Sequence, residues 1–166
     1  MSAKRDQIEA VATRAIKGSG LGSVSFRTLA DEVGVKSSSV HYHFRTKDDL
    51  AEAVIRRYST DFEAILARID SEHATPIERL DAFIDVYEAA VQNGDICLCG
   101  MMAAELTSLD DAGQRALRGY FRLNEQWLEK LFATSETSLQ GVTPAELAQL
   151  FIAGLQGATL IDRAEG

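Results

Sequence analysis

Residues 26–44 read FRTLADEVGVKSSSVHYHF, and this stretch decides how the N-terminal third of the chain folds. Residues 26–33 have the apolar spacing of a short helix, with Ser25 ahead of them as a cap and Gly34 after them as a stop. A second short helix follows a tight turn, and the inward-facing set is Leu29, Ala30, Val33, Val35, Val40 and Phe44. The pattern predicts a helix-turn-helix, whose second helix is free to enter the major groove of DNA.

The polar residues of the second helix have the chemistry that a nucleic-acid contact needs. The small hydroxyl side chains of Ser37, Ser38 and Ser39 let the backbone approach closely and can bond phosphate oxygens or base edges. Longer polar side chains follow at residues 41–43. The alternative is an ordinary polar helix face. The histidines predict no metal site, because residues i and i+2 do not share a helix face.

Basic residues gather in the first third of an acidic chain. The formal net charge is −8 over 166 residues, yet residues 1–58 carry ten Lys and Arg against seven Asp and Glu. Residues 59–166 carry seven against eighteen. Salt screens charge over about 8 to 10 Å, so the local face matters more than the total. The distribution favours a module that approaches phosphates, although charge varies along any chain.

The rest of the sequence predicts an all-α protein. Apolar side chains make up 46% of the residues, only two prolines interrupt the chain, and apolar positions recur at helical spacing. Outside the helix-turn-helix, a first helix is expected from Ile8 to the glycines of KGSGLGS, and a long helix from a Thr46–Asp49 capping box to about residue 72. Further helices are expected over residues 76–92, 96–109, 111–137 and 144–166. The absence of long apolar runs and of a secretory signal predicts a cytoplasmic protein without a membrane partner.

Two quoted segments carry a resemblance to a known family. Residues 8–58, IEAVATRAIKGSGLGSVSFRTLADEVGVKSSSVHYHFRTKDDLAEAVIRRY, resemble the DNA-binding domain of the TetR family of bacterial regulators. CLCGMMAAEL, residues 97–106, is similar to a segment at the start of helix six in one broad group of that family. The resemblance implies a three-helix helix-turn-helix domain over 1–46 and a helical ligand-binding and dimerisation domain over 47–166. It also leads us to expect one more helix after LIDRAEG.

The resemblance implies a ligand-responsive transcriptional regulator, most often a repressor. Members of the family bind a near-palindromic operator in double-stranded DNA as homodimers and are released by a small-molecule inducer. No enzyme is predicted, because the sequence has no phosphate-binding glycine loop, HExxH motif or paired nucleophile and base, and no cofactor or metal is expected. The alternatives are a cysteine-based sensor of electrophiles or oxidants, and a helical protein-interaction adaptor that does not bind DNA.

Position by position, the resemblance implies which residues contact DNA. Arg27 and the three serines face the groove, and Arg27 is the expected base reader, because a guanidinium can bond guanine O6 and N7 together. Phosphates are held mainly by Tyr42, His43 and Lys47. The family more often has tyrosine at the position of His41. The full expected set is Arg27, Lys36, Ser37, Ser38, Ser39, His41, Tyr42, His43 and Lys47.

Apolar and aromatic residues beyond residue 58 are candidates for a ligand pocket. They recur on helical faces with few charges among them, which favours a neutral or weakly polar ligand, although such stripes more often form plain core. The expected pocket residues are Phe62, Phe83, Tyr87, Cys97, Met101, Trp127 and Phe151. Cys97 is either a reactive thiol or a small buried apolar residue. Glu105 either anchors a polar group or caps the packing of the sixth helix.

A stripe at helical spacing after Pro144 is the candidate dimerisation surface. Its positions follow the i, i+3, i+4 pattern of a helix that buries one face. The stripe consists of Leu147, Leu150, Phe151, Leu155 and Ala158. We therefore expect a homodimer.

Overall fold

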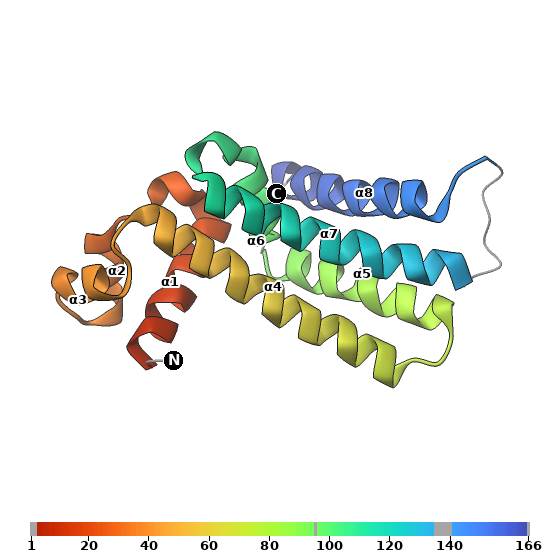
Figure 1. The fold of residues 1–166 in the computed structure, drawn as a ribbon, viewed down its shortest axis with the longest axis horizontal. Helices are drawn as coiled ribbons and strands as arrows, with labels where there is room; N and C mark the ends of the chain where they lie inside the picture. The colour runs from red at the N-terminus through yellow and green to blue at the C-terminus, as the bar shows by residue number, and fades with distance from the viewer. Residues whose placement is uncertain (1–2, 95, 135–140, 166) are drawn as a thin grey trace. The chain divides into compact units, whose positions relative to one another are not determined.

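The computed structural model describes residues 3–94, 96–134 and 141–165, and within them the secondary structure is entirely helical. The predicted all-α class is confirmed. Figure 1 shows the order of the elements, which are α1 (Ala3–Ser19), η1 (Leu21–Ser23), α2 (Phe26–Val33), α3 (Ser37–His43), α4 (Lys47–Glu72), α5 (Pro76–Gln92), α6 (Leu98–Ala104), η2 (Leu106–Ser108), α7 (Asp111–Thr134) and α8 (Pro144–Glu165).

Two predicted helices differ from the structure in their boundaries. The helix expected over 96–109 is wrong as a single element, because α6 begins at Leu98 and the chain leaves helical geometry at Glu105, where φ is −107° and ψ is 28°. The first helix begins at Ala3, before the first apolar position Ile8, because polar residues extend a helix without contributing to its core. The end expected for the seventh helix near residue 137 lies outside the described residues.

The chain divides into two compact units, and each contains two separate segments. The first unit comprises Met1–Tyr58 and Leu98–Arg118, and the second comprises Ser59–Cys97 and Gly119–Gly166. Helices α4 and α7 therefore contribute residues to both units. The domain boundary expected between residues 46 and 47 stays a prediction about independent folding.

Buried aliphatic side chains hold the first unit together. α1 contributes Ile8, Ala12 and Ile16, which share one face of the helix, and α1 contacts α2, α3 and α6. The inward set predicted for the helix-turn-helix is largely confirmed, because four of its six members are buried. These are Leu29, Ala30, Val40 and Phe44, while Val33 and Val35 are half-buried.

Aromatic side chains fill much of the second unit. α5 begins with a capping box, in which the Glu78 backbone N–H donates to the Thr75 hydroxyl at 3.3 Å and the Thr75 backbone N–H donates to Glu78 Oε2 at 2.9 Å. This helix packs against α8 and carries the buried Phe83 and Tyr87. Among the described residues, none of the helices combines the length and apolar character needed to cross a membrane.

Candidate nucleic-acid interface

Local hydrogen bonds define the beginning and the end of α2. The Thr28 backbone N–H donates to the Ser25 hydroxyl at 3.1 Å, and the Ser25 backbone N–H donates to the Thr28 hydroxyl at 3.3 Å. Gly34 has φ 71° and ψ 41°, a conformation that favours glycine, and the Val35 backbone N–H donates to the Ala30 carbonyl at 2.9 Å. These bonds end α2 and turn the chain towards α3.

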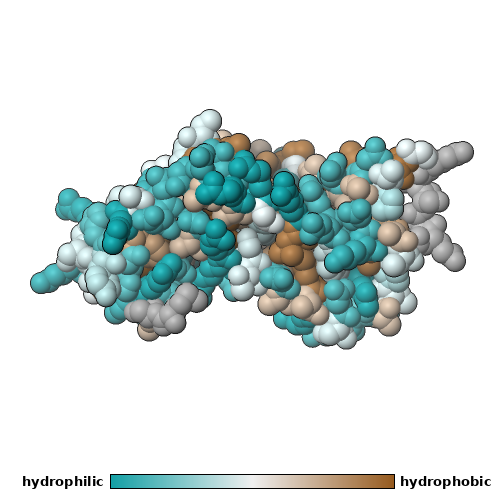
Figure 2. Space-filling model, in the orientation of Figure 1, coloured by the Kyte–Doolittle hydropathy of each residue, from teal (hydrophilic) through white to brown (hydrophobic). Residues whose placement is uncertain are grey.

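Helix α3 is attached to its unit by few side chains and presents the rest to solvent. Val40 and the following Phe44 are buried, whereas Tyr42 is 85% exposed. The surface over α2 and α3, at the left of Figure 2, is mostly hydrophilic. Of the remaining predicted contact residues in this region, Lys36, Ser37, Ser38 and His41 are exposed, and Ser39 and His43 are half-buried.

His41 has a specific packing partner in α2. Its ring lies edge-on to the ring of Phe26, with 4.7 Å between the centroids. The rings of Tyr42 and His43 form a similar edge-on pair at 5.2 Å. Edge-on contact is one of the preferred arrangements of two aromatic rings. The histidine at position 41 therefore packs against α2 while it remains exposed.

The two predicted cationic contacts have different surroundings. Arg27 is exposed in the first turn of α2, and among the described residues no hydrogen bond or ion pair engages its guanidinium. Lys47 Nζ instead donates to the Gly22 carbonyl oxygen at 3.4 Å. The predicted capping box at the start of α4 is confirmed, since Thr46 and Asp49 exchange backbone-to-side-chain hydrogen bonds, each 3.0 Å long.

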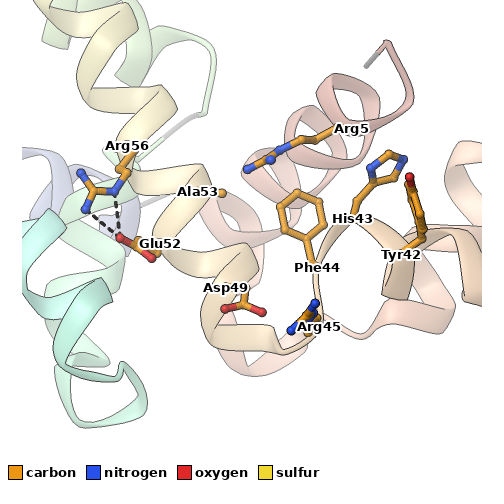
Figure 3. Close-up of a pocket in the computed structure, with 9 residues that line it drawn as sticks. All are labelled: Arg5, Tyr42, His43, Phe44, Arg45, Asp49, Glu52, Ala53 and Arg56. Atoms are coloured by element: carbon orange, nitrogen blue, oxygen red, sulfur yellow. Dashed lines mark hydrogen bonds and ion pairs between the residues drawn. The ribbon is translucent and has the colours of Figure 1, made fainter. Parts of the chain in front are cut away.

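An open pocket of about 360 Å³ lies beside the C-terminal end of α3 (Figure 3). Arg5 lies over the Phe44 ring, with its guanidinium carbon 5.1 Å from the centroid. Arg56 Nη2 donates to Glu52 Oε1 at 2.7 Å, so one of the cations in the pocket is already paired. The pocket is lined by Arg5, Tyr42, His43, Phe44, Arg45, Asp49, Glu52, Ala53 and Arg56.

Three arginines line the pocket, and none of them belongs to the set of DNA contacts expected from the sequence. Arg45 is exposed directly after the buried Phe44, and its position next to HYHF is the signal that could have identified it. Arg5, which precedes the apolar positions of the first helix and could add a contact to the DNA backbone, has a partner within the fold, because its Nε donates to Glu9 Oε1 at 2.9 Å and Glu9 is buried. Arg57 Nη1 lies 3.4 Å from the other carboxylate oxygen of Glu9. Arg5 and Arg57 therefore support the fold, and Arg45 is the added surface cation.

Most of the predicted pocket residues meet in the second unit. Phe83 stacks on Trp127 with 5.3 Å between the ring centroids and an interplanar angle of 16°. Its centroid is also 6.0 Å from that of Phe62, 5.4 Å from that of Tyr87 and 6.4 Å from that of Phe151. The structure thus brings together five of the seven residues as one aromatic cluster.

The other two predicted pocket residues have separate positions. Cys97 is 6% exposed, and its Sγ lies 3.5 Å from the hydroxyl of Tyr120, close enough for a hydrogen bond in either direction. The ring of Tyr120 lies 5.5 Å from that of Phe62, so Cys97 borders the aromatic cluster. Met101 belongs to α6 in the first unit, whereas the aromatic cluster belongs to the second.

Comparison with known proteins gives a consistent result. The family model described as "Bacterial regulatory proteins, tetR family" matches residues 8–54. Transcriptional regulator AcuR of Cereibacter sphaeroides is 30% identical over an alignment of 150 residues that covers 85% of this chain and 68% of AcuR. HTH-type transcriptional repressor KstR2 of Mycolicibacterium smegmatis is 27% identical over 89 residues, 53% of this chain and 43% of KstR2.

The fold is also similar to that of a solved transcriptional regulator. A crystal structure of a TetR-family transcriptional regulator from Agrobacterium tumefaciens matches with a TM-score of 0.93 at 29% sequence identity. The match covers 99% of this chain and 89% of that one.

Proposed function

This chain belongs to the TetR family of bacterial transcriptional regulators, and we propose that it acts there as a ligand-responsive repressor. It binds a near-palindromic operator as a homodimer, and a small molecule releases it. The observation that carries the proposal is α3, a helix with a buried Val40 and a mostly polar, exposed surface. The name of KstR2, a transcriptional repressor, supports repression over activation.

In the proposed complex, α3 enters the major groove. Arg27 reads a base, because its exposed guanidinium has no described partner to give up. The hydroxyls of Ser37 and Ser38 bond phosphate or base edges at the start of α3. Tyr42 and Lys47 hold backbone phosphates. The exposed Arg45 joins this set as a further phosphate contact. We retain the remaining predicted contacts, Lys36, Ser39, His41 and His43.

The proposed ligand binds at the aromatic cluster of the second unit. Stacked and edge-on rings offer an apolar surface with few charges, which suits a neutral or weakly polar molecule. Tyr87 and Gln156 supply polar atoms at this cluster, since Gln156 Nε2 lies 3.4 Å from the Tyr87 hydroxyl. Met101 stays a prediction from the sequence, because it belongs to α6 in the first unit and the cluster belongs to the second.

The proposed homodimer uses α8. Leu150 on this helix is 64% exposed, which leaves a large aliphatic side chain at the surface. Leu160 and Ile161 are also exposed, so apolar surface continues along the helix. A symmetric pair would place two recognition helices about 34–36 Å apart, one turn of DNA.

A cysteine-based sensor is the second candidate function. Contact of Cys97 with Tyr120 at the edge of the aromatic cluster favours it, because modification of a thiol there would disturb the packing of the aromatic residues. Its burial opposes it, because reactive thiols are accessible. The test is titration with N-ethylmaleimide on bound DNA. Release that persists in Cys99→Ser and disappears in Cys97→Ser supports the sensor, and unchanged DNA binding after stoichiometric modification refutes it.

The main proposal is tested by binding of the purified full chain to the DNA that flanks its own gene, with and without a cell extract. We expect an affinity that falls steeply with salt, because each neutralised phosphate releases counterions. A random duplex of the same length is the control and should bind more weakly. Absence of salt-dependent binding to either duplex would instead support the protein-interaction adaptor, which does not bind DNA.

A further inference from the structure

Glu105 joins two parts of the first unit that are far apart in the sequence. Its Oε2 accepts a hydrogen bond of 3.0 Å from the backbone N–H of Gly22, in the loop between α1 and α2. The position of Glu105 is itself fixed, because its carbonyl oxygen accepts a bond of 2.8 Å from the Ser108 backbone N–H. The break between α6 and η2 therefore directs this carboxylate at the α1–α2 loop.

The loop has a shape that admits the carboxylate. Gly20 has φ 79° and ψ 168°, a conformation that side chains other than glycine's rarely adopt. A Cβ atom at Gly20 would overlap the carboxylate of Glu105. The residue is thus required to be small both by its backbone conformation and by the close approach of Glu105.

The same loop contacts the start of α4 and leads into α2. Lys47 Nζ donates to the Gly22 carbonyl oxygen at 3.4 Å, so both backbone polar groups of Gly22 are engaged. The Val24 backbone N–H donates to the Leu21 carbonyl at 3.1 Å, and the next residue, Ser25, caps α2. The conformation of the loop therefore sets both the surroundings of Lys47 and the beginning of the helix that carries Arg27.

We propose that Glu105 is a positioning residue for DNA binding. By holding Gly22, it fixes the loop of residues 20–23 in the arrangement that places Lys47 and the start of α2 for contact with DNA. This role rests on the proposed DNA-binding function. Glu105 itself does not contact DNA in this arrangement, and its effect passes through Gly22.

The sign of the expected effect separates positioning from simple electrostatics. A carboxylate repels DNA phosphates, so loss of its charge alone would strengthen binding. Glu105→Ala and Glu105→Gln remove the same charge, but only glutamine keeps a side-chain oxygen that accepts the Gly22 N–H bond. A positioning role therefore predicts weaker binding for the alanine variant and near-normal binding for the glutamine variant.

The experiment uses the full chain and the duplex that the wild-type protein selects from a random-sequence pool. We expect Glu105→Ala to bind this duplex about tenfold more weakly, as loss of a hydrogen bond to a charged group implies. In the DNA-free protein, NMR should show faster hydrogen exchange at the Gly22 amide in this variant and not in Glu105→Gln. Asp111→Asn, which alters an exposed carboxylate at the start of α7, should change neither result.

A second substitution tests the same contact from the other side. Gly20→Ala should displace the carboxylate and reproduce the loss of affinity. In the double variant with Glu105→Ala the two losses should be less than additive, because both act on one contact. Circular dichroism confirms that each variant is folded.

Two outcomes would overturn the role. The first is wild-type affinity in Glu105→Ala, and the second is a loss of affinity in Glu105→Gln as large as that in Glu105→Ala. Failure of the wild-type protein to select any duplex would overturn the DNA-binding function itself, and this role with it. The selection is carried out first with the wild-type protein, so this failure would be seen before the affinity of any variant is measured.

Discussion

Replacing Arg27 by alanine should remove sequence discrimination, whereas replacing Lys47 by alanine should weaken binding to all DNA alike. A bidentate contact between arginine and guanine contributes about 1–3 kcal/mol of discrimination. A homodimer makes the contact twice, so Arg27→Ala should weaken binding to the selected duplex by about 2–6 kcal/mol, which is at least roughly thirtyfold. Arg27 has no described partner whose loss would add to this value.

Lys47 gives a different expectation because it already contacts the Gly22 carbonyl. A phosphate would replace this contact, so the net gain from Lys47 is small and independent of sequence. The clearest change in Lys47→Ala should be in the salt dependence. Two lost phosphate contacts per dimer reduce the slope of log affinity against log salt by about 1.8.

Fluorescence anisotropy at three salt concentrations measures both effects on the selected duplex and on a random duplex of equal length. Arg122→Ala removes the same charge as Arg27→Ala from an exposed site in the second unit and should preserve discrimination. Equal losses on the two duplexes for Arg27→Ala would refute its role as a base reader. An unchanged salt slope for Lys47→Ala would refute its contact with phosphate.

Three further predictions address assembly and stability. Leu150→Glu should convert the dimer into a monomer, because it places a charge on the exposed apolar surface of α8. Light scattering measures the change, and a monomeric wild-type protein at micromolar concentration would contradict the proposed interface. Phe83→Ala should lower the free energy of unfolding by about 3–5 kcal/mol, measured by urea denaturation, because Phe83 is fully buried and stacks on Trp127. Hydrogen bonds from the Thr75 backbone N–H, and then from its hydroxyl, hold the pKa of Glu78 below its ordinary value. This carboxylate therefore stabilises the fold at neutral pH, and the stabilisation is lost as the pH falls through the lowered pKa. Glu78→Gln should flatten the acid side of the curve of unfolding free energy against pH.

The features that local chemistry controls were predictable from the sequence. Gly34 ends α2 because a left-handed conformation is required there, and Thr46 with Asp49 caps α4 through bonds within four residues. The inward positions Val40 and Phe44 followed from the spacing of the few apolar residues in this region. Such signals depend only on near neighbours in the chain, so they can be read without the tertiary structure.

Features that depend on distant partners were not predictable. Apolar spacing continues through residue 105, yet the helix breaks there, and the carboxylate of Glu105 bonds a glycine 83 residues earlier. Met101 shares the apolar character of the aromatic residues, but only the tertiary structure places it in the other unit. The buried Glu9 is similar, because its partner Arg57 is contributed by α4.

The discontinuity of the first unit has a consequence for synthesis of the protein on the ribosome. Residues 1–58 emerge first, and the segment Leu98–Arg118 that completes the unit begins to emerge about 40 residues later. At ordinary elongation rates this is a delay of about two to eight seconds. During this interval the surface of α1 that later contacts α6 remains uncovered and available to chaperones. A chimera that transplants only residues 1–58 onto another regulator would keep this surface uncovered permanently, so the graft should carry residues 98–118 as well.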